Sequence, residues 1–132
     1  MQQNIQAFQH EKLDAVIVNV AGCGAMMKDY SHIYGELTGR KADHQNADES
    51  DETRFCNQVR DISEFLMTLG PIKPQGRIEA VVAYQDACHL QHAQKIRQQP
   101  RDLLKLIPGI SVRPIAEAEL KCWPSCASGS AT

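Results

Sequence analysis

Cysteines are the residues of this chain best suited to chemistry, and two of them occupy similar places in the sequence. Cys23 lies between Gly22 and Gly24, directly after an apolar run, and Cys88 follows a second such run. At the start of a helix, unsatisfied N–H groups and the positive end of the helix dipole stabilise a thiolate, which binds metal or attacks sulfur. Gly22 and Gly24 are expected to adopt positive φ and to let the backbone pass close to a bulky ligand.

A short internal repeat relates the two cysteines. The segments "DAVIVNVAGC" (14–23) and "EAVVAYQDAC" (79–88) align without a gap, each as an acidic residue, an alanine, an apolar strand and a cysteine. Two βα units of this kind would place both thiols at the carboxyl edge of one parallel sheet, where open α/β folds bind their ligands. The repeat therefore predicts that Cys23 and Cys88 converge.

Neighbouring residues leave alternatives open. His89 and His92 follow Cys88 in the opening turn of a predicted helix, where either could donate to the thiolate or ligate a metal, and where a capping or solvent-facing role is equally consistent. Cys23 alone could be a small apolar residue in a tight corner. Cys56 lies beside an aromatic residue on the apolar flank of a helix, which predicts core packing.

Two further cysteines, Cys122 and Cys126, lie near the end of the chain with three residues between them. This spacing is looser than the C-x-x-C of zinc ribbons and redox motifs, so the pair indicates little by itself. It gains meaning only beside Cys23 and Cys88.

The elements that position these residues alternate along the chain. Short apolar runs predict strands over 13–20, 78–85 and 110–115. Apolar residues at three- and four-residue spacing predict helices over 25–37, 51–69, 88–99 and 100–109. Residues 38–51 are polar and read as a solvated loop. The alternation predicts an α/β fold with parallel strands and right-handed crossovers.

Composition narrows the function classes. The chain has 132 residues, 14 basic and 16 acidic side chains and few aromatic residues, which predicts one compact domain without a nucleic-acid surface. It has no run long enough to span a bilayer and no export signal, so we expect a cytoplasmic protein without direct membrane insertion, associated with a membrane only through partners. Its five cysteines are then thiols or ligands rather than disulfides. Nucleotide-binding loops and hydrolase triads are missing from the sequence.

Three segments carry a family resemblance, "NVAGCGAMMKDYSHIY" (19–34), "VRDISEFL" (59–66) and "CHLQHAQKIRQQPRDLLKLIPG" (88–109). With them the chain resembles glycolate oxidase iron–sulfur subunits and the cysteine-rich domain shared with lactate-utilisation proteins and heterodisulfide reductase subunits. The resemblance implies a parallel sheet built from tandem βα cysteine-rich repeats, incomplete at both ends. A cysteine-rich (CCG-type) domain is thereby expected over 10–126, with a disordered tail over 127–132.

The same resemblance implies an iron–sulfur cluster of the [4Fe–4S] type and an electron-transfer role beside flavin-containing glycolate oxidase subunits, which would oxidise the 2-hydroxy acid. Cys23, Cys88 and Cys122 match the family's cysteine motifs, and Cys126 is a candidate substitute for the neighbour that the second motif lacks. Gly22, Gly24 and His89 would then help to bind the cofactor.

The family pattern is lost after Cys122, where Trp123 and Pro124 stand, so we expect a fragment or the product of a frameshifted gene. Two alternatives stay open beside the cluster. One is a metal-free thiol–disulfide module in which Cys23 and Cys88 cycle between thiol and disulfide. The other is a truncated remnant without function.

Overall fold

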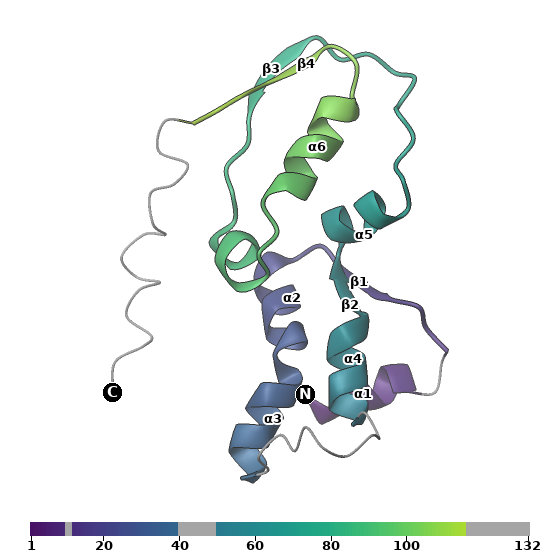
Figure 1. Ribbon diagram of the computed structural model, residues 1–132, viewed down its shortest axis with the longest axis vertical. Coiled ribbons are helices and arrows are strands. Elements are labelled where there is room, and N and C mark those ends of the chain that lie inside the picture. The colour runs from purple at the N-terminus through teal and green to yellow at the C-terminus, as the bar shows by residue number, and fades with distance from the viewer. Residues whose placement is uncertain (10–11, 40–49, 116–132) are drawn as a thin grey trace.

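The computed structural model describes residues 1–9, 12–39 and 50–115 of the chain, and its helices and strands alternate as an α/β fold (Figure 1). The elements in chain order are α1 (Gln2–Gln9), β1 (Val16–Val18), α2 (Ala21–Lys28), α3 (Tyr30–Thr38), α4 (Asp51–Gln58), β2 (Val59–Asp61), α5 (Ile62–Thr68), β3 (Ala80–Ala83), η1 (His89–Ala93), α6 (Gln98–Leu106) and β4 (Ile110–Arg113). The predicted fold class is confirmed. Within these residues, no helix is both long and apolar enough to cross a bilayer.

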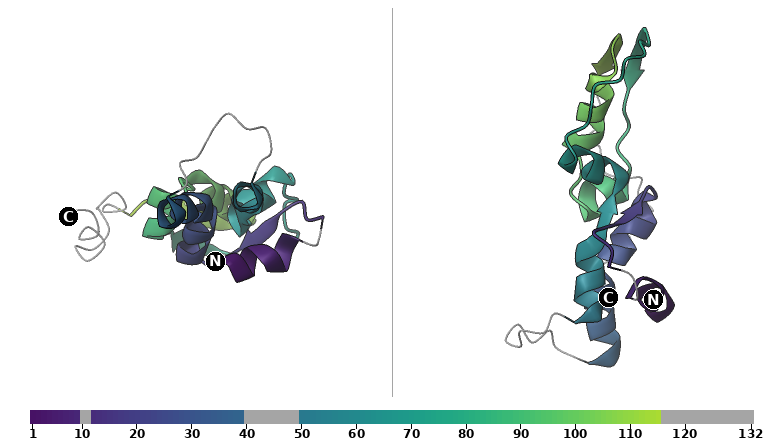
Figure 2. Two further views of the ribbon diagram at one scale, coloured as in Figure 1. Left: turned by 90° about the horizontal axis from the view of Figure 1, so that it is seen from below. Right: turned by 90° about the vertical axis from the view of Figure 1, so that its right-hand side faces the viewer.

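The strands form two separate parallel pairs. β1 pairs with β2, with Val16 opposite Val59, and β3 pairs with β4, with Ala80 opposite Ile110. Figures 1 and 2 show an elongated molecule with the β3–β4 pair at one end and the β1–β2 pair near the middle. The expectation that Cys23 and Cys88 follow strands of one sheet is therefore wrong. β1, before Cys23, and β3, before Cys88, each pair with the next strand along the chain and not with each other.

A strand interrupts the helix that the apolar spacing predicts over 51–69. Val59 is fully buried against β1, and pairing with β1 holds Val59–Asp61 in an extended conformation. Asp61 then begins α5 with a capping box: its carboxylate accepts a hydrogen bond from the Ser63 backbone N–H at 2.9 Å, and Glu64 accepts from the Asp61 N–H at 3.4 Å. The prediction of one continuous helix is wrong because the apolar spacing around Val59 is compatible with a strand as well as with a helix.

The helix predicted over 25–37 starts earlier, at Ala21, and breaks at Asp29 into α2 and α3. In an unbroken helix the Ser31 N–H would donate to the Met27 carbonyl. Here the Cys56 thiol lies between them, donating to Met27 O and accepting from Ser31 N, both at 3.4 Å. Cys56 is buried, as predicted, and its sulfur also satisfies the backbone groups that the break exposes.

The main core lies where α1, α4 and β1 meet. In it the buried Phe55 ring stacks with both Phe8 and Tyr30, with centroids 5.9 and 5.7 Å away. Four buried residues form the cluster, Ile5, Val16, Phe55 and Val59. This core anchors β1, and β1 leads directly into the helix that carries Cys23.

The segment after Cys88 differs from the helix predicted over 88–99. It forms the single π-helical turn η1, closed by a hydrogen bond from Gln94 N to His89 O at 3.0 Å, and then reverses at Lys95, whose φ is 60°. α6 follows, with Pro100 buried in its first turn, and packs against β4. Gly109, with φ 87°, turns the chain into β4, where a Cβ would meet the Ile78 carbonyl oxygen at 2.7 Å.

Candidate thiol site between α2 and η1

Cys23 is the third residue of α2, three positions after the N-cap residue Val20 and just past the carboxyl end of β1. Its side chain is exposed. Val20, at the N-cap, makes no side-chain hydrogen bond to the first turn. The strand–turn–helix placement predicted for this thiol is therefore present, although the turn is shorter than expected and the thiol lies inside the helix.

Gly22 and Gly24 do not have the predicted conformation. Both lie in α2, and neither is among the glycines with positive φ in the described part of the chain. The prediction was wrong because the helix starts before them, at Ala21. A Cβ at Gly22 would meet nothing within 4 Å, whereas a Cβ at Gly24 would lie 2.8 Å from Gln94 Nε2. The close approach at Gly24 is thus to a side chain of the protein.

Cys88 is the N-cap residue of η1 and is half-buried. Its sulfur lies 3.4 Å from Nδ1 of His89, so a contact with the thiol, one of the alternatives left open for this imidazole, is present. His92 lies in the same turn and is exposed. A cofactor-binding role for His89 stays a prediction.

The chain that leads from β3 to Cys88 is held by a charge pair. Asp86, whose side chain is 4% exposed, accepts two hydrogen bonds from the Arg101 guanidinium, at 2.6 and 2.7 Å. Arg101 also donates to Arg97 O and lies 5.2 Å from the centre of the Tyr84 ring. The hydrogen bonds that Arg101 donates to Asp86 raise the pKa of Arg101, and burial, reinforced by the negative charge of Asp86, raises the pKa of Tyr84. α6 thereby fixes the segment that ends at Cys88.

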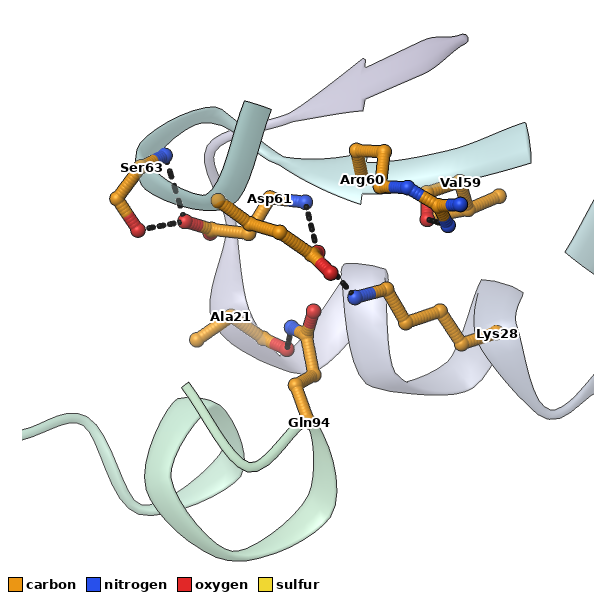
Figure 3. A network of polar contacts seen from close by, with 8 residues as sticks. Ala21, Lys28, Val59, Arg60, Asp61, Ser63 and Gln94 are labelled. Atoms are coloured by element: carbon orange, nitrogen blue, oxygen red, sulfur yellow. Dashed lines mark hydrogen bonds and ion pairs between the residues drawn. The ribbon is translucent and has the colours of Figure 1, made fainter. Parts of the chain in front are cut away.

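The elements that carry Cys23 and Cys88 pack against each other although their strands belong to different sheets. Gln94, at the end of η1, donates a hydrogen bond from Nε2 to the Ala21 carbonyl at 2.9 Å (Figure 3). Ala21 is the first residue of α2, two positions before Cys23. α2 and η1 are thus in contact, while the predicted convergence of the Cys23 and Cys88 sulfurs stays a prediction.

A second polar network fixes α2 against α5. Lys28, in the last turn of α2, donates to Glu64 at 2.7 Å, and Glu64 also belongs to the capping box of Asp61 (Figure 3). Sequence reasoning missed both this contact and Gln94. The D-x-x-E signal of the capping box was present at Asp61, but no sequence signal indicated the partner of Gln94.

The donors of this site suit part of an iron–sulfur centre. Cys23 and Cys88 supply two thiols on adjoining elements, and Cys56 is excluded because it is buried at the break between α2 and α3. Cys122 and Cys126 lie outside the described residues. Over 1–9, 12–39 and 50–115, no group of three or more metal-binding side chains is assembled. Iron–sulfur clusters usually take four cysteines, so the described thiols fit half of such a ligand set.

Comparison with known proteins shows that the chain is similar to iron–sulfur proteins. Residues 82–128 match the cysteine-rich domain family named CCG. The chain is 34% identical over 122 residues, 91% of its length, to the probable glycolate oxidase iron–sulfur subunit of Bacillus subtilis, and 30% identical over 96% of its length to an uncharacterized iron–sulfur protein of Methanocaldococcus jannaschii. It is 24% identical over 92% of its length to lactate utilization protein A of Anoxybacillus flavithermus.

These matches confirm the resemblance drawn from the cysteine motifs. The chain spans 26% of the Bacillus subtilis subunit, 20% of the Methanocaldococcus jannaschii protein and 48% of lactate utilization protein A. No solved structure matches the chain. The chain is thus similar to part of proteins that are named as an iron–sulfur subunit or an iron–sulfur protein.

Proposed function

We propose that this chain is part of the electron-transfer subunit of a 2-hydroxy-acid oxidoreductase of the glycolate oxidase type. The proposal is supported by the match of residues 82–128 to the cysteine-rich domain and by the similarity of most of the chain to iron–sulfur proteins. The observation that carries the proposal is the contact between α2 and η1, which brings together the segments of Cys23 and Cys88 although they follow strands of different pairs. Substrate oxidation would take place on a flavin-containing partner subunit.

In this proposal Cys23 and Cys88 are two of the ligands of an iron–sulfur cluster of the [4Fe–4S] type, with Cys122 and Cys126 as the candidates for the others. The cluster would accept and release one electron at a time. Cys23 is exposed, which suits a ligand that must meet an incoming cluster. His89 lies within reach of the Cys88 sulfur and would hold a hydrogen bond to it, and such contacts to ligand sulfurs tune the reduction potential.

Anaerobic reconstitution with iron and sulfide tests the proposal. We expect the full chain to bind iron and to develop the visible absorption of a cluster, and we expect Cys23→Ser and Cys88→Ser to lose most of both. Cys56→Ser is the matched control, since Cys56 is buried away from the site and a serine hydroxyl can still bond Met27 O and Ser31 N. Iron content and a spectrum unchanged in both site variants would refute the ligand assignment.

One observation favours a second candidate, a metal-free thiol–disulfide module. The His89 imidazole beside Cys88 can take up the proton of that thiol and so produce the attacking thiolate. A disulfide substrate would then be reduced to two thiols while Cys23 and Cys88 form a disulfide, so that two electrons and two protons pass to the substrate. A colourless, iron-free protein whose Cys23 and Cys88 react rapidly with a disulfide would select this function.

A further inference from the structure

Something other than a common sheet must set the distance between Cys23 and Cys88. β1 and β3, the strands that precede them, belong to different pairs, so strand pairing does not relate the two thiols. The two polypeptide segments meet instead where α2 packs on η1. The groups that fix this contact therefore decide whether the sulfurs can act together.

Gln94 joins the two segments. Its backbone N–H closes the turn η1 by donating to His89 O at 3.0 Å, one residue after Cys88. Its side-chain Nε2 donates to Ala21 O at 2.9 Å, two residues before Cys23. In Figure 3 the Gln94 side chain reaches from its turn toward Ala21. One residue thus bonds the backbone next to each thiol.

The space for this side chain is provided by Gly24. Gly24 is buried, and a Cβ there would lie 2.8 Å from Nε2 and 3.4 Å from Cδ and Oε1 of Gln94. The amide group therefore lies directly against the backbone of α2. Oε1 is buried and has no hydrogen-bond partner within the described part of the chain. A buried oxygen without a partner is unfavourable, so the hydrogen bond from Nε2 to Ala21 O is the polar contact that holds the amide at this position.

We propose that Gln94, seated on Gly24, is the positioning residue that sets the placement of Cys88 relative to Cys23. This inference rests on the proposed function, because the proposed function assigns Cys23 and Cys88 to one shared site. Residue 94 touches neither sulfur in this proposal; it acts through the backbone of Ala21 and His89. Loss of the side-chain hydrogen bond would let η1 shift on α2 and would lower the population in which the sulfurs face each other.

Cross-linking of the reduced, iron-free full chain tests this placement. A short bis-maleimide is added, and mass spectrometry measures the rate at which Cys23 and Cys88 peptides become linked, while a mono-maleimide measures the reactivity of each thiol alone. We expect Gln94→Ala and Gly24→Ala to slow the linking two- to tenfold, the population change that corresponds to about one hydrogen bond, without slowing single labelling. Gly22→Ala is the matched control, because its new methyl group meets nothing.

Two further variants guard against misfolding. Gln94→Met keeps the volume but not the donor and should behave like Gln94→Ala, and Gly24→Ala should have no added effect in the Gln94→Ala background. Linking at the wild-type rate in the Gln94 variants, or no linking in the wild-type chain, overturns the inference. Iron content after reconstitution separates the positioning role of Gln94 from the proposed function. If linking is fast and depends on Gln94 but the protein binds no iron, only the proposed function is refuted. If the protein binds iron but linking does not depend on Gln94, only the positioning role is refuted.

Discussion

The pair formed by Arg101 and Asp86 allows a sharp prediction, because its two members differ in burial. The Asp86 side chain is 4% exposed and the Arg101 side chain 25% exposed, so removal of the cation leaves a buried carboxylate, whereas removal of the anion leaves a cation that water can reach. Arg101 also keeps its bond to Arg97 O at 2.6 Å and its place over the Tyr84 ring. The two substitutions should therefore differ in cost.

We expect Arg101→Met to lower the free energy of unfolding by about 3 kcal/mol or more, the range for a buried pair that loses one partner. Asp86→Asn keeps the shape of the side chain and should cost about 1.5 kcal/mol, the lower end for hydrogen bonds to charged groups. Arg77→Met is the matched control, because Arg77 pairs with Glu79 on the surface with both side chains well exposed, and such pairs contribute at most about 1 kcal/mol.

Urea unfolding of the full chain, followed by far-ultraviolet circular dichroism, measures these differences, provided that the dependence on urea concentration is the same in every variant. A loss in Arg101→Met no larger than that in Asp86→Asn would refute the reasoning. It would mean that water reaches Asp86 and that the pair does not hold the segment leading to Cys88.

Three other predictions follow from single contacts. Because the pKa of Tyr84 is raised in the folded state, the phenol loses its proton more readily in the unfolded chain. The contribution of Tyr84 to the free energy of unfolding is therefore fully present below pH 10 and is lost as the pH rises above it. Tyr84→Phe should flatten this part of the profile of unfolding free energy against pH. Asp61→Ala removes the N-cap of α5, which accepts from Ser63, and should cost about 1–2 kcal/mol in urea unfolding; no loss would contradict the capping box. A maleimide should label exposed Cys23 within the native protein and buried Cys56 only after unfolding, so equal rates for the two thiols in the native state would argue against the described packing.

Much of the local structure follows from short sequence patterns. The apolar runs of β1, β3 and β4 are strands, and Cys23 and Cys88 follow β1 and β3 as predicted. Such patterns succeed because strand propensity and helix starts depend on a few neighbouring residues. The cysteine motifs also indicated a resemblance to cysteine-rich iron–sulfur proteins, which the comparisons confirm.

Patterns that fit two structures misled the prediction. The apolar spacing around Val59 is compatible with a helix, but pairing with β1 makes this segment a strand. The helix over 25–37 was predicted unbroken, because nothing near Asp29 signals that a thiol from α4 enters between Met27 and Ser31. In both cases the deciding partner lies far along the chain, where local propensity carries no information.

By itself, the sequence determined the α/β class, the thiols that follow strands and the resemblance to cysteine-rich iron–sulfur proteins. Only the tertiary structure decided that the strands form two separate pairs and that α2 meets η1 through Gln94 and Ala21, which lie 73 positions apart. The physical reason is that the contact depends on the missing side chain at Gly24 and on the end of a π-helical turn. Both features gain their role only when α2 and η1 are packed together, so neither segment's sequence indicates the contact by itself.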